Sequence, residues 1–327
     1  MSVRLWSSVA WREQAAGWID RRLADAGLER TGEVEQPRVR PWATVLRAPT
    51  TGGDVWMKAA GSATAFEAGL YELLAREAPD DVLAPLAVDA PRGWMLLPDG
   101  GPSLAARLDG GGWEEELATA LGQYGRLQRS LAPHAGELPS LGVPDMRPEV
   151  IPERFPEALE AARASAPSVP PAGAPSPSAA SPAGTLAAVE ALADDVARWC
   201  ERLAASPVPA SLDHNDLHQD NVLGTGPYRF YDWGDAVLAH AFAAMLVPAQ
   251  VLAGPQLARA HAAYLEAFAD LAPPDELATD LELACRVARI ARTLTWERAL
   301  RSAREQGEPL DPFFANAPYA ELAALVT

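Results

Sequence analysis

The first part of the chain shows two hydrophobic patterns. Between residues 6 and 27 the apolar side chains recur at helical spacing, and Gly27 is typical of a residue that ends a helix. Residues 42–47 and 55–58 are instead short apolar runs of the kind found in strands, separated by the turn residues 49–53. This pattern predicts an N-terminal helix followed by a β-hairpin.

A second helix and two further strands are predicted next. Residues 64–77 carry their large apolar side chains on one helical face, and Thr64 and Glu67 have the spacing of a capping box. Residues 82–88 and 94–97 resemble short strands. The pattern therefore predicts a small sheet with one inserted helix.

Helical patterns dominate beyond residue 100. The predicted helices are 113–131, 186–205, 237–252, 256–270, 275–306 and 316–325. Residues 163–184 are almost entirely Ala, Pro, Ser and Gly, so they bury too little apolar surface to offset their ordering entropy and are predicted to be a flexible insertion. We expect an α+β chain with an N-terminal lobe (residues 1–98) and a C-terminal lobe (residues 99–327).

Composition narrows the class of protein. The chain has 27 basic and 44 acidic residues, a net charge of −17, which argues against binding nucleic acid or anionic lipid and is compatible with a cationic ligand. Two cysteines, Cys200 and Cys285, give no disulfide framework. The first residues are charged throughout and contain no apolar run of the length expected for a signal peptide, and no apolar run is long enough to span a membrane. We expect a cytoplasmic protein, monomeric or dimeric.

One basic residue stands out. Lys58 is the only lysine, whereas arginine accounts for the other 26 basic residues. In a chain that uses arginine wherever it can, the remaining lysine is a candidate for chemistry that needs a compact charge on a flexible stem. Chance survival of a surface lysine is the alternative.

The densest group of polar residues is Asp213-His214-Asn215-Asp216-Leu217-His218-Gln219-Asp220-Asn221. The spacing of His214, Asp216 and Asn221 is that of a kinase catalytic loop. A strand-like segment and a turn follow, and then Asp232-Trp233-Gly234, which resembles the Asp-Phe-Gly element of kinases. These motifs, together with Lys58 on a predicted strand and Glu67 on a predicted helix, point to phosphoryl transfer.

The sequence resembles the aminoglycoside phosphotransferase family, relatives of the choline kinases in the protein-kinase-like superfamily. The resemblance covers most of the chain outside the insertion, and it implies a two-lobed fold with a nucleotide-binding sheet lobe and a larger helical catalytic lobe. It implies ATP or GTP with Mg²⁺ as cofactors. Asp216 would accept the proton of the substrate hydroxyl, while Asn221 and Asp232 would hold Mg²⁺. Asp235 is a further candidate ligand.

Other residues have more than one interpretation. His214 is expected to fix the loop by hydrogen bonds, and His218 either lies near the transferred phosphate or packs. Lys58 would bridge the nucleotide phosphates and pair with a helix carboxylate, with Glu67 as first choice and Glu72 as second. The spacing between Lys58 and Glu67 is shorter than is usual in the superfamily.

The nucleotide loop and the hinge depart from the kinase pattern. No glycine-rich loop precedes Lys58, so Thr44 or backbone N–H groups near it are the candidates for a phosphate contact. Pro98 has no N–H to offer a base, which leaves the carbonyl of Leu97 or the N–H of Asp99.

The acceptor is the least determined part of the prediction. Asp213, Asp235 and Glu297 are candidates to face an amine-bearing acceptor, and Trp296, Phe313 and Phe314 are candidates for a ring-binding face. The predicted function is an ATP- and Mg-dependent kinase for a hydroxyl of an aminoglycoside-like or other hydroxylated, amine-bearing small molecule, with antibiotic resistance among the roles of the family. The alternatives are a housekeeping kinase for a sugar, choline or homoserine, and a nucleotide-binding scaffold without activity. A protein kinase is least favoured, because no Ala-Pro-Glu element follows Asp232.

Overall fold

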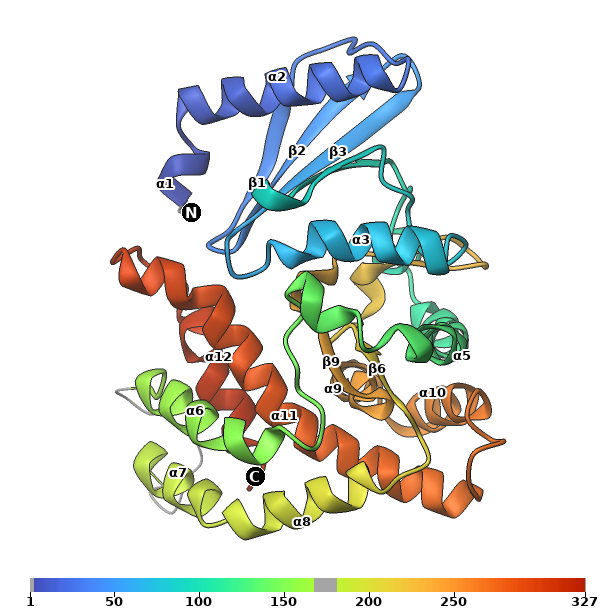
Figure 1. Ribbon diagram of the computed structural model, residues 1–327, viewed down its shortest axis with the longest axis vertical. Coiled ribbons are helices and arrows are strands. Elements are labelled where there is room, and N and C mark those ends of the chain that lie inside the picture. The colour runs from blue at the N-terminus through green and yellow to red at the C-terminus, as the bar shows by residue number, and fades with distance from the viewer. Residues whose placement is uncertain (1–2, 168–180, 327) are drawn as a thin grey trace.

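The computed structural model describes residues 3–167 and 181–326, arranged as a sheet lobe above a helical lobe (Figure 1). The sheet is antiparallel and its strands lie in the order β1-β2-β3-β5-β4. Their bounds are β1 (Glu35–Val39), β2 (Ala43–Thr50), β3 (Gly53–Ala60), β4 (Ala87–Asp89) and β5 (Trp94–Pro98). The predicted α+β class, with a small antiparallel sheet lobe and a larger helical lobe, is confirmed. The predicted hairpin is β2–β3, whereas β1 was not predicted.

A helix covers one face of this sheet. After the short α1 (Val3–Trp6), α2 (Val9–Asp25) begins at the N-cap Ser8 and lies across the strands (Figure 1). The apolar face of α2 packs against the sheet and forms a small core with it. In this core the ring of Trp94 contacts the rings of Trp11 and Trp18 edge-on. Burial of this kind, rather than helix propensity, holds a helix in place.

Strand alternation sends the side chains of β3 to opposite faces of the sheet. Met57 points into the core under α2, whereas its neighbours Trp56 and Lys58 point to the other face. Helix α3 (Phe66–Glu77) lies on that second face (Figure 1). The predicted capping box is wrong, because α3 starts at Phe66 without a side-chain cap and the Glu67 carboxylate turns to Lys58 instead.

The C-terminal lobe is built around two long helices, α5 (Trp113–Leu131) and the 32-residue α11 (Pro274–Glu305). The other helices are α4 (Leu104–Arg107), α6 (Ile151–Ala164), α7 (Pro182–Glu190), α8 (Ala193–Ala204), α9 (Leu246–Val251), α10 (Gly254–Glu266) and α12 (Pro312–Ala323). Most of the predicted insertion 163–184 lies outside the described residues, and its ends belong to α6 and α7. Among residues 3–167 and 181–326, no helix is long and apolar enough to cross a membrane.

Four short strands interrupt these helices. β6 (Ala210–Asp213) pairs with β9 (Val237–His240), and β7 (Val222–Leu223) pairs with β8 (Arg229–Phe230). The predicted helix 237–252 is therefore wrong in its first half. A continuous apolar run fits a fully buried strand as well as a helix, and here its first four residues are all buried beside β6. The two pairs hold the polar loop between β6 and β7 in place.

His240, at the end of β9, makes a testable contribution to stability. Its Nδ1 accepts the N–H of Phe242, its ring is buried, and burial lowers the pKa of His240 to about 4. Because an unfolded histidine titrates near 6.5, the unfolded chain binds the extra proton first, so stability is lost as the pH falls below about 6.5. We expect wild type to lose about 2 kcal/mol more than His240→Asn between pH 7 and pH 5. Asparagine keeps a side-chain acceptor for the Phe242 N–H. Urea unfolding at the two pH values measures this, and equal losses would contradict it.

Candidate active site

A buried ion-pair network joins the two lobes. The Lys58 Nζ on β3 lies 2.7 Å from Glu67 Oε1 and 2.6 Å from Glu67 Oε2 on α3, and it also contacts the Asp232 carboxylate. Glu67 is fully buried, whereas the Asp232 side chain is 37% exposed. Glu67, not Glu72, is therefore the partner of Lys58. Helix α3 starts six residues after β3 ends, so Glu67 reaches Lys58 from its first turn.

The charges in this network depend on one another. Burial alone would lower the pKa of Lys58 and favour its neutral form. The carboxylates of Asp232 and Glu67 outweigh burial and raise the pKa of Lys58 above its ordinary value. Burial likewise opposes ionisation of Asp232, and the Lys58 ammonium outweighs it and lowers the pKa of Asp232. Burial raises the pKa of Glu67. Lys58 is thus a fixed cation whose charge faces the space beside Asp232.

Backbone geometry aims Asp232 into that space. Asp232 has a left-handed backbone with φ of 66°, which a non-glycine residue seldom adopts, and its N–H donates to the Tyr71 hydroxyl at 3.3 Å. A Cβ atom at Gly234 would lie 3.2 Å from the Glu67 carboxylate and 3.5 Å from Lys58 Nζ. The Asp-Trp-Gly motif therefore uses its glycine for close approach to the ion pair.

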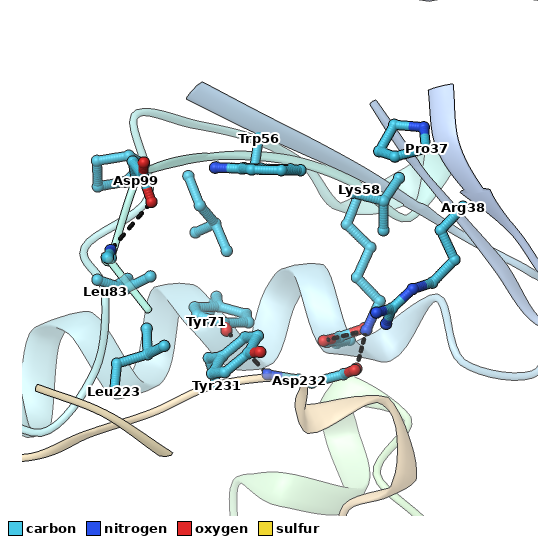
Figure 2. Close-up of a pocket in the computed structure, with 16 residues that line it drawn as sticks. Pro37, Arg38, Trp56, Lys58, Tyr71, Leu83, Asp99, Leu223, Tyr231 and Asp232 are labelled. Carbon is cyan, nitrogen blue, oxygen red and sulfur yellow. Dashed lines mark hydrogen bonds and ion pairs between the residues drawn. The ribbon is translucent and has the colours of Figure 1, made fainter. Parts of the chain in front are cut away.

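A cavity of about 370 Å³ opens beside Lys58 and Asp232. Figure 2 shows the indole of Trp56 above it and the side chains of Tyr231 and Leu223 below, which leaves a slot between flat and apolar groups. Leu97 and Asp99, predicted at the hinge, also line it. The Asp99 N–H is not available to a base, because it donates to Asp54 O at 3.1 Å.

If the slot under Trp56 takes a nucleotide base, Trp56→Ala will weaken nucleotide binding. An aromatic face stacked on a base is worth about 1–3 kcal/mol on truncation, so the Kd for ADP should rise by about 5- to 150-fold. Calorimetric titration with ADP measures this. Trp199→Ala is a matched control, because Trp199 is a partly buried tryptophan that packs against the core of the helical lobe beneath Arg286 and does not line the cavity. An unchanged Kd in Trp56→Ala would contradict the slot as the base site.

The loop between β6 and β7 brings three of the predicted residues together. The Asn221 Nδ2 donates to Asp216 O at 2.8 Å and to Asp216 Oδ2 at 3.2 Å, and His218 Nε2 lies 3.4 Å from Asp216 Oδ2. Burial lowers the pKa of His218, but the neighbouring Asp216 carboxylate raises it by more. The pKa of His218 therefore lies above its ordinary value. The loop therefore holds the Asp216 carboxylate so that its Oδ2 lies beside the Asn221 amide and the His218 ring.

His214 and Asp213 occupy buried positions behind this loop. The His214 Nε2 lies 2.9 Å from Tyr231 O, its ring packs on Trp233, and burial lowers the pKa of His214. The Asp213 side chain is fully buried, accepts the N–H of Asn215 at 2.7 Å, and has its pKa raised by burial to about 7. Both shape the loop from inside, and Asp213 does not face an acceptor.

The donor set suits a hard divalent cation. The Asn221 amide nitrogen donates to Asp216, so the amide oxygen is the atom left for a ligand. Lys58 bonds Oδ1 of Asp232, which leaves Oδ2 as the candidate ligand atom. Mg²⁺ is commonly held by one or two protein oxygens together with phosphates. Within the described residues no group of three or more His, Cys, Asp or Glu could hold a metal ion. Burial raises the pKa of Asp235 to about 6.

Arg292, on α11, is a functional candidate that sequence reasoning missed. Its Nη2 donates to Asp216 Oδ1 at 2.7 Å, and its Nη1 lies 3.8 Å from Asp235 Oδ2. Burial opposes ionisation of Asp216, but the Arg292 guanidinium outweighs it and lowers the pKa of Asp216 well below its usual range. The sequence contains 26 arginines, and no feature of the sequence around Arg292 indicates that this one contacts Asp216.

The predicted acceptor residues do not form an acidic pocket. Asp213 is buried, Glu297 pairs with Arg304, and Asp235 lies beside Arg292. The predicted aromatic residues divide. Trp296 and Phe314 pack edge-on against Trp42 of the sheet lobe, while Phe313 is 73% exposed.

Thr44 is also placed away from the cavity. Its side chain is fully buried, and its hydroxyl donates to Arg38 O at 2.8 Å and accepts from Gln36 Nε2 at 2.9 Å. These bonds hold β1 against β2. Pro37 and Arg38 are the residues of β1 that line the cavity, and Figure 2 shows Arg38 beside Lys58.

Comparison with solved structures identifies the fold. Macrolide 2'-phosphotransferase from Brachybacterium faecium covers 96% of this chain and 98% of its own, at 17% identity and a TM-score of 0.54. Ethanolamine kinase from Plasmodium vivax covers 98% and 89%, at 12% identity and a TM-score of 0.62. A spectinomycin phosphotransferase in complex with ADP and spectinomycin covers 94% and 98%, at 12% identity and a TM-score of 0.50. No protein-family profile matches the sequence, and no curated protein is significantly similar to it. The chain thus shares the protein-kinase-like fold of these small-molecule phosphotransferases.

Proposed function

We propose that this protein is a small-molecule kinase that transfers the γ-phosphoryl group of ATP or GTP to a hydroxyl group of a small acceptor. One observation carries the proposal. The Lys58–Glu67 pair and Asp232 border a cavity of nucleotide size, and a loop that holds Asp216 and Asn221 follows the strand β6 in the lobe below. Phosphoryl transfer needs a cation, ligands for a metal ion and a carboxylate base. Lys58 is the cation, Asn221 and Asp232 are the candidate metal ligands, and Asp216 is the candidate base.

Each group has a defined task in this proposal. The slot under Trp56 takes the base, and Lys58, kept charged by Asp232 and Glu67, contacts the phosphates. Asn221 and Asp232 would hold Mg²⁺, which neutralises charge on the phosphate oxygens when bound. Asp216 orients the acceptor hydroxyl and receives its proton as the new O–P bond forms and the nucleoside diphosphate leaves.

The acceptor class rests on two considerations. The structural neighbours named above are phosphotransferases or kinases of macrolides, ethanolamine and spectinomycin, all small molecules. The carboxylates expected to attract an amine are buried or paired, so an amine-bearing acceptor receives no support from them. We therefore propose a hydroxylated small molecule, with aminoglycoside-like compounds, macrolides, choline, homoserine and sugars as the classes to test.

The test is acceptor-dependent release of nucleoside diphosphate. Purified protein is incubated with Mg-ATP or Mg-GTP and each acceptor class in turn, beside Asp216→Asn. Release that requires one acceptor and disappears in the variant supports the proposal and identifies the substrate. Tight nucleotide binding without release from any acceptor or from water would instead support a scaffold. Failure to bind any nucleotide would overturn the assignments of Lys58 and Asp232.

A further inference from the structure

The guanidinium of Arg292 is buried between the loop that carries Asp216 and the C-terminal helix α12, and it contacts both. Its side chain is 7% exposed. Besides Asp216 Oδ1 at 2.7 Å, its Nη1 donates to the backbone carbonyl of Asn215, and its Nε lies 3.5 Å from Glu321 Oε1 of α12. The ring of Trp296 lies 5.6 Å from the guanidinium on the following turn of α11. The two terminal nitrogens therefore hydrogen-bond two different groups of the loop, while Nε makes only an ion-pair contact with Glu321.

The loop is attached to α11 at two adjacent turns. Asn215, which has a left-handed backbone with φ of 57°, donates from Nδ2 to Thr295 Oγ1 at 2.8 Å, while its carbonyl accepts from Arg292. Residues 292 and 295 lie on neighbouring positions of one helix face. The residue immediately before Asp216 is thus held on both its side chain and its carbonyl by a rigid helix.

We propose that Arg292 is the positioning residue for Asp216. By binding Oδ1 it leaves Oδ2 as the oxygen that meets the acceptor hydroxyl, and it fixes the direction in which that oxygen points. This inference rests on the proposed function, in which Asp216 is the base. The consequence is large, because displacement of a reacting group by about 1 Å costs about 10²-fold in rate.

Lysine would not replace this arginine. A guanidinium presents its N–H groups in a planar fork, so one side chain bonds the Asn215 carbonyl and the Asp216 carboxylate together. An ammonium is a point charge on a flexible stem and has no fixed fork. A role in charge balance alone would tolerate lysine, whereas a positioning role would not.

A double-mutant cycle on kcat tests the proposal. The variants are Arg292→Met, Asp216→Asn and the two combined, with the acceptor found in the panel, or water as the acceptor if none is found. We expect Arg292→Met to lower kcat about 10²-fold, with KM for the nucleotide changed less than twofold. The double variant should be no slower than Asp216→Asn alone, because Arg292 acts through Asp216. Losses that multiply would overturn the proposal.

Three further variants separate positioning from folding. Arg292→Lys keeps the buried charge and should still lower kcat at least about tenfold. Arg292→Gly should regain kcat when methylguanidine is added, and Asp216→Asn should not. The matched control is Arg289→Met, because Arg289 lies one turn earlier on α11 and also contacts Glu321, at 3.3 Å, without touching Asp216. Its kcat should stay within about twofold of wild type.

A structural readout keeps this inference separate from the proposed function. If the wild type transfers phosphate neither to an acceptor nor to water, the proposed function fails. The positioning inference is then decided by a crystal structure of Arg292→Met. We expect the Asp216 carboxylate to rotate and lose its 3.2 Å contact with Asn221 Nδ2. An Asp216 side chain that keeps its place without Arg292 would overturn the inference whatever the activity.

Discussion

Asp216→Asn is expected to lower kcat for phosphoryl transfer by about 10²- to 10⁴-fold, the range that a positioned general base contributes. Asparagine keeps the size of the side chain and its neighbours Arg292 and Asn221, but its amide cannot receive the hydroxyl proton in place of a carboxylate oxygen. The measurement is nucleoside diphosphate release under saturating Mg-nucleotide. The loss should be in kcat, with the Kd for ADP unchanged.

A control in the same loop makes this result specific. Asp220 is 58% exposed and carries the same charge four residues on, so Asp220→Asn tests general loss of negative charge. We expect its kcat to stay within about threefold of wild type. If Asp216→Asn retained more than a tenth of wild-type activity, the assignment of Asp216 as base would be wrong, and another group would have to receive the proton.

The sequence was most informative where chemistry demands a fixed spacing. His214, Asp216 and Asn221 were predicted as one unit, and the structure places them in one loop because β6 and β7 hold its two ends. The partner of Lys58 was less certain, since the spacing of nine residues to Glu67 is short. The structure explains it through the short connection from β3 to α3, which brings the first turn of the helix to the strand.

Two elements could not be predicted, because their residues have local preferences that disfavour the secondary structure they adopt. β1 contains Pro37 and charged residues, and it is an edge strand that pairs only with β2, so it lacks the alternating pattern of a half-buried strand. α6 contains Pro156 in its interior, where a proline argues against a helix. In both cases tertiary contacts outweigh local preference.

Long-range contacts between common residue types leave no trace in one sequence. Arg292 lies 76 residues from Asp216, and nothing distinguishes it from the other arginines of α11. The same limit applies to the acceptor side. Burial of Asp213 and pairing of Glu297 depend on helices distant in the chain, so exposed acidic residues were expected where the fold places covered ones.

Lys58→Met is expected to have two separable effects. Activity should fall by at least about 10²-fold, because no other cation contacts both Glu67 and Asp232 among the described residues and the phosphates lose a fixed charge. Stability should fall by about 3–5 kcal/mol, because removing one partner of a buried ion pair leaves the fully buried Glu67 carboxylate uncompensated. Burial raises the pKa of Glu67 to about 7 even with Lys58 beside it, so protonation of Glu67 limits the loss at neutral and lower pH, and the full loss is expected above that range.

The double variant Lys58→Met, Glu67→Met separates the two effects. Replacing both members of a buried pair by apolar side chains is often neutral or stabilising, so the free energy of unfolding in urea should return to within about 1 kcal/mol of wild type. Activity should not return, because the phosphates still lack the cation. Asp232, being partly exposed, loses its Lys58 contact in both variants and keeps its access to water. A stable double variant that regained activity would show that the Lys58–Glu67 pair serves the fold alone, whereas a stable and inactive one assigns Lys58 to the nucleotide.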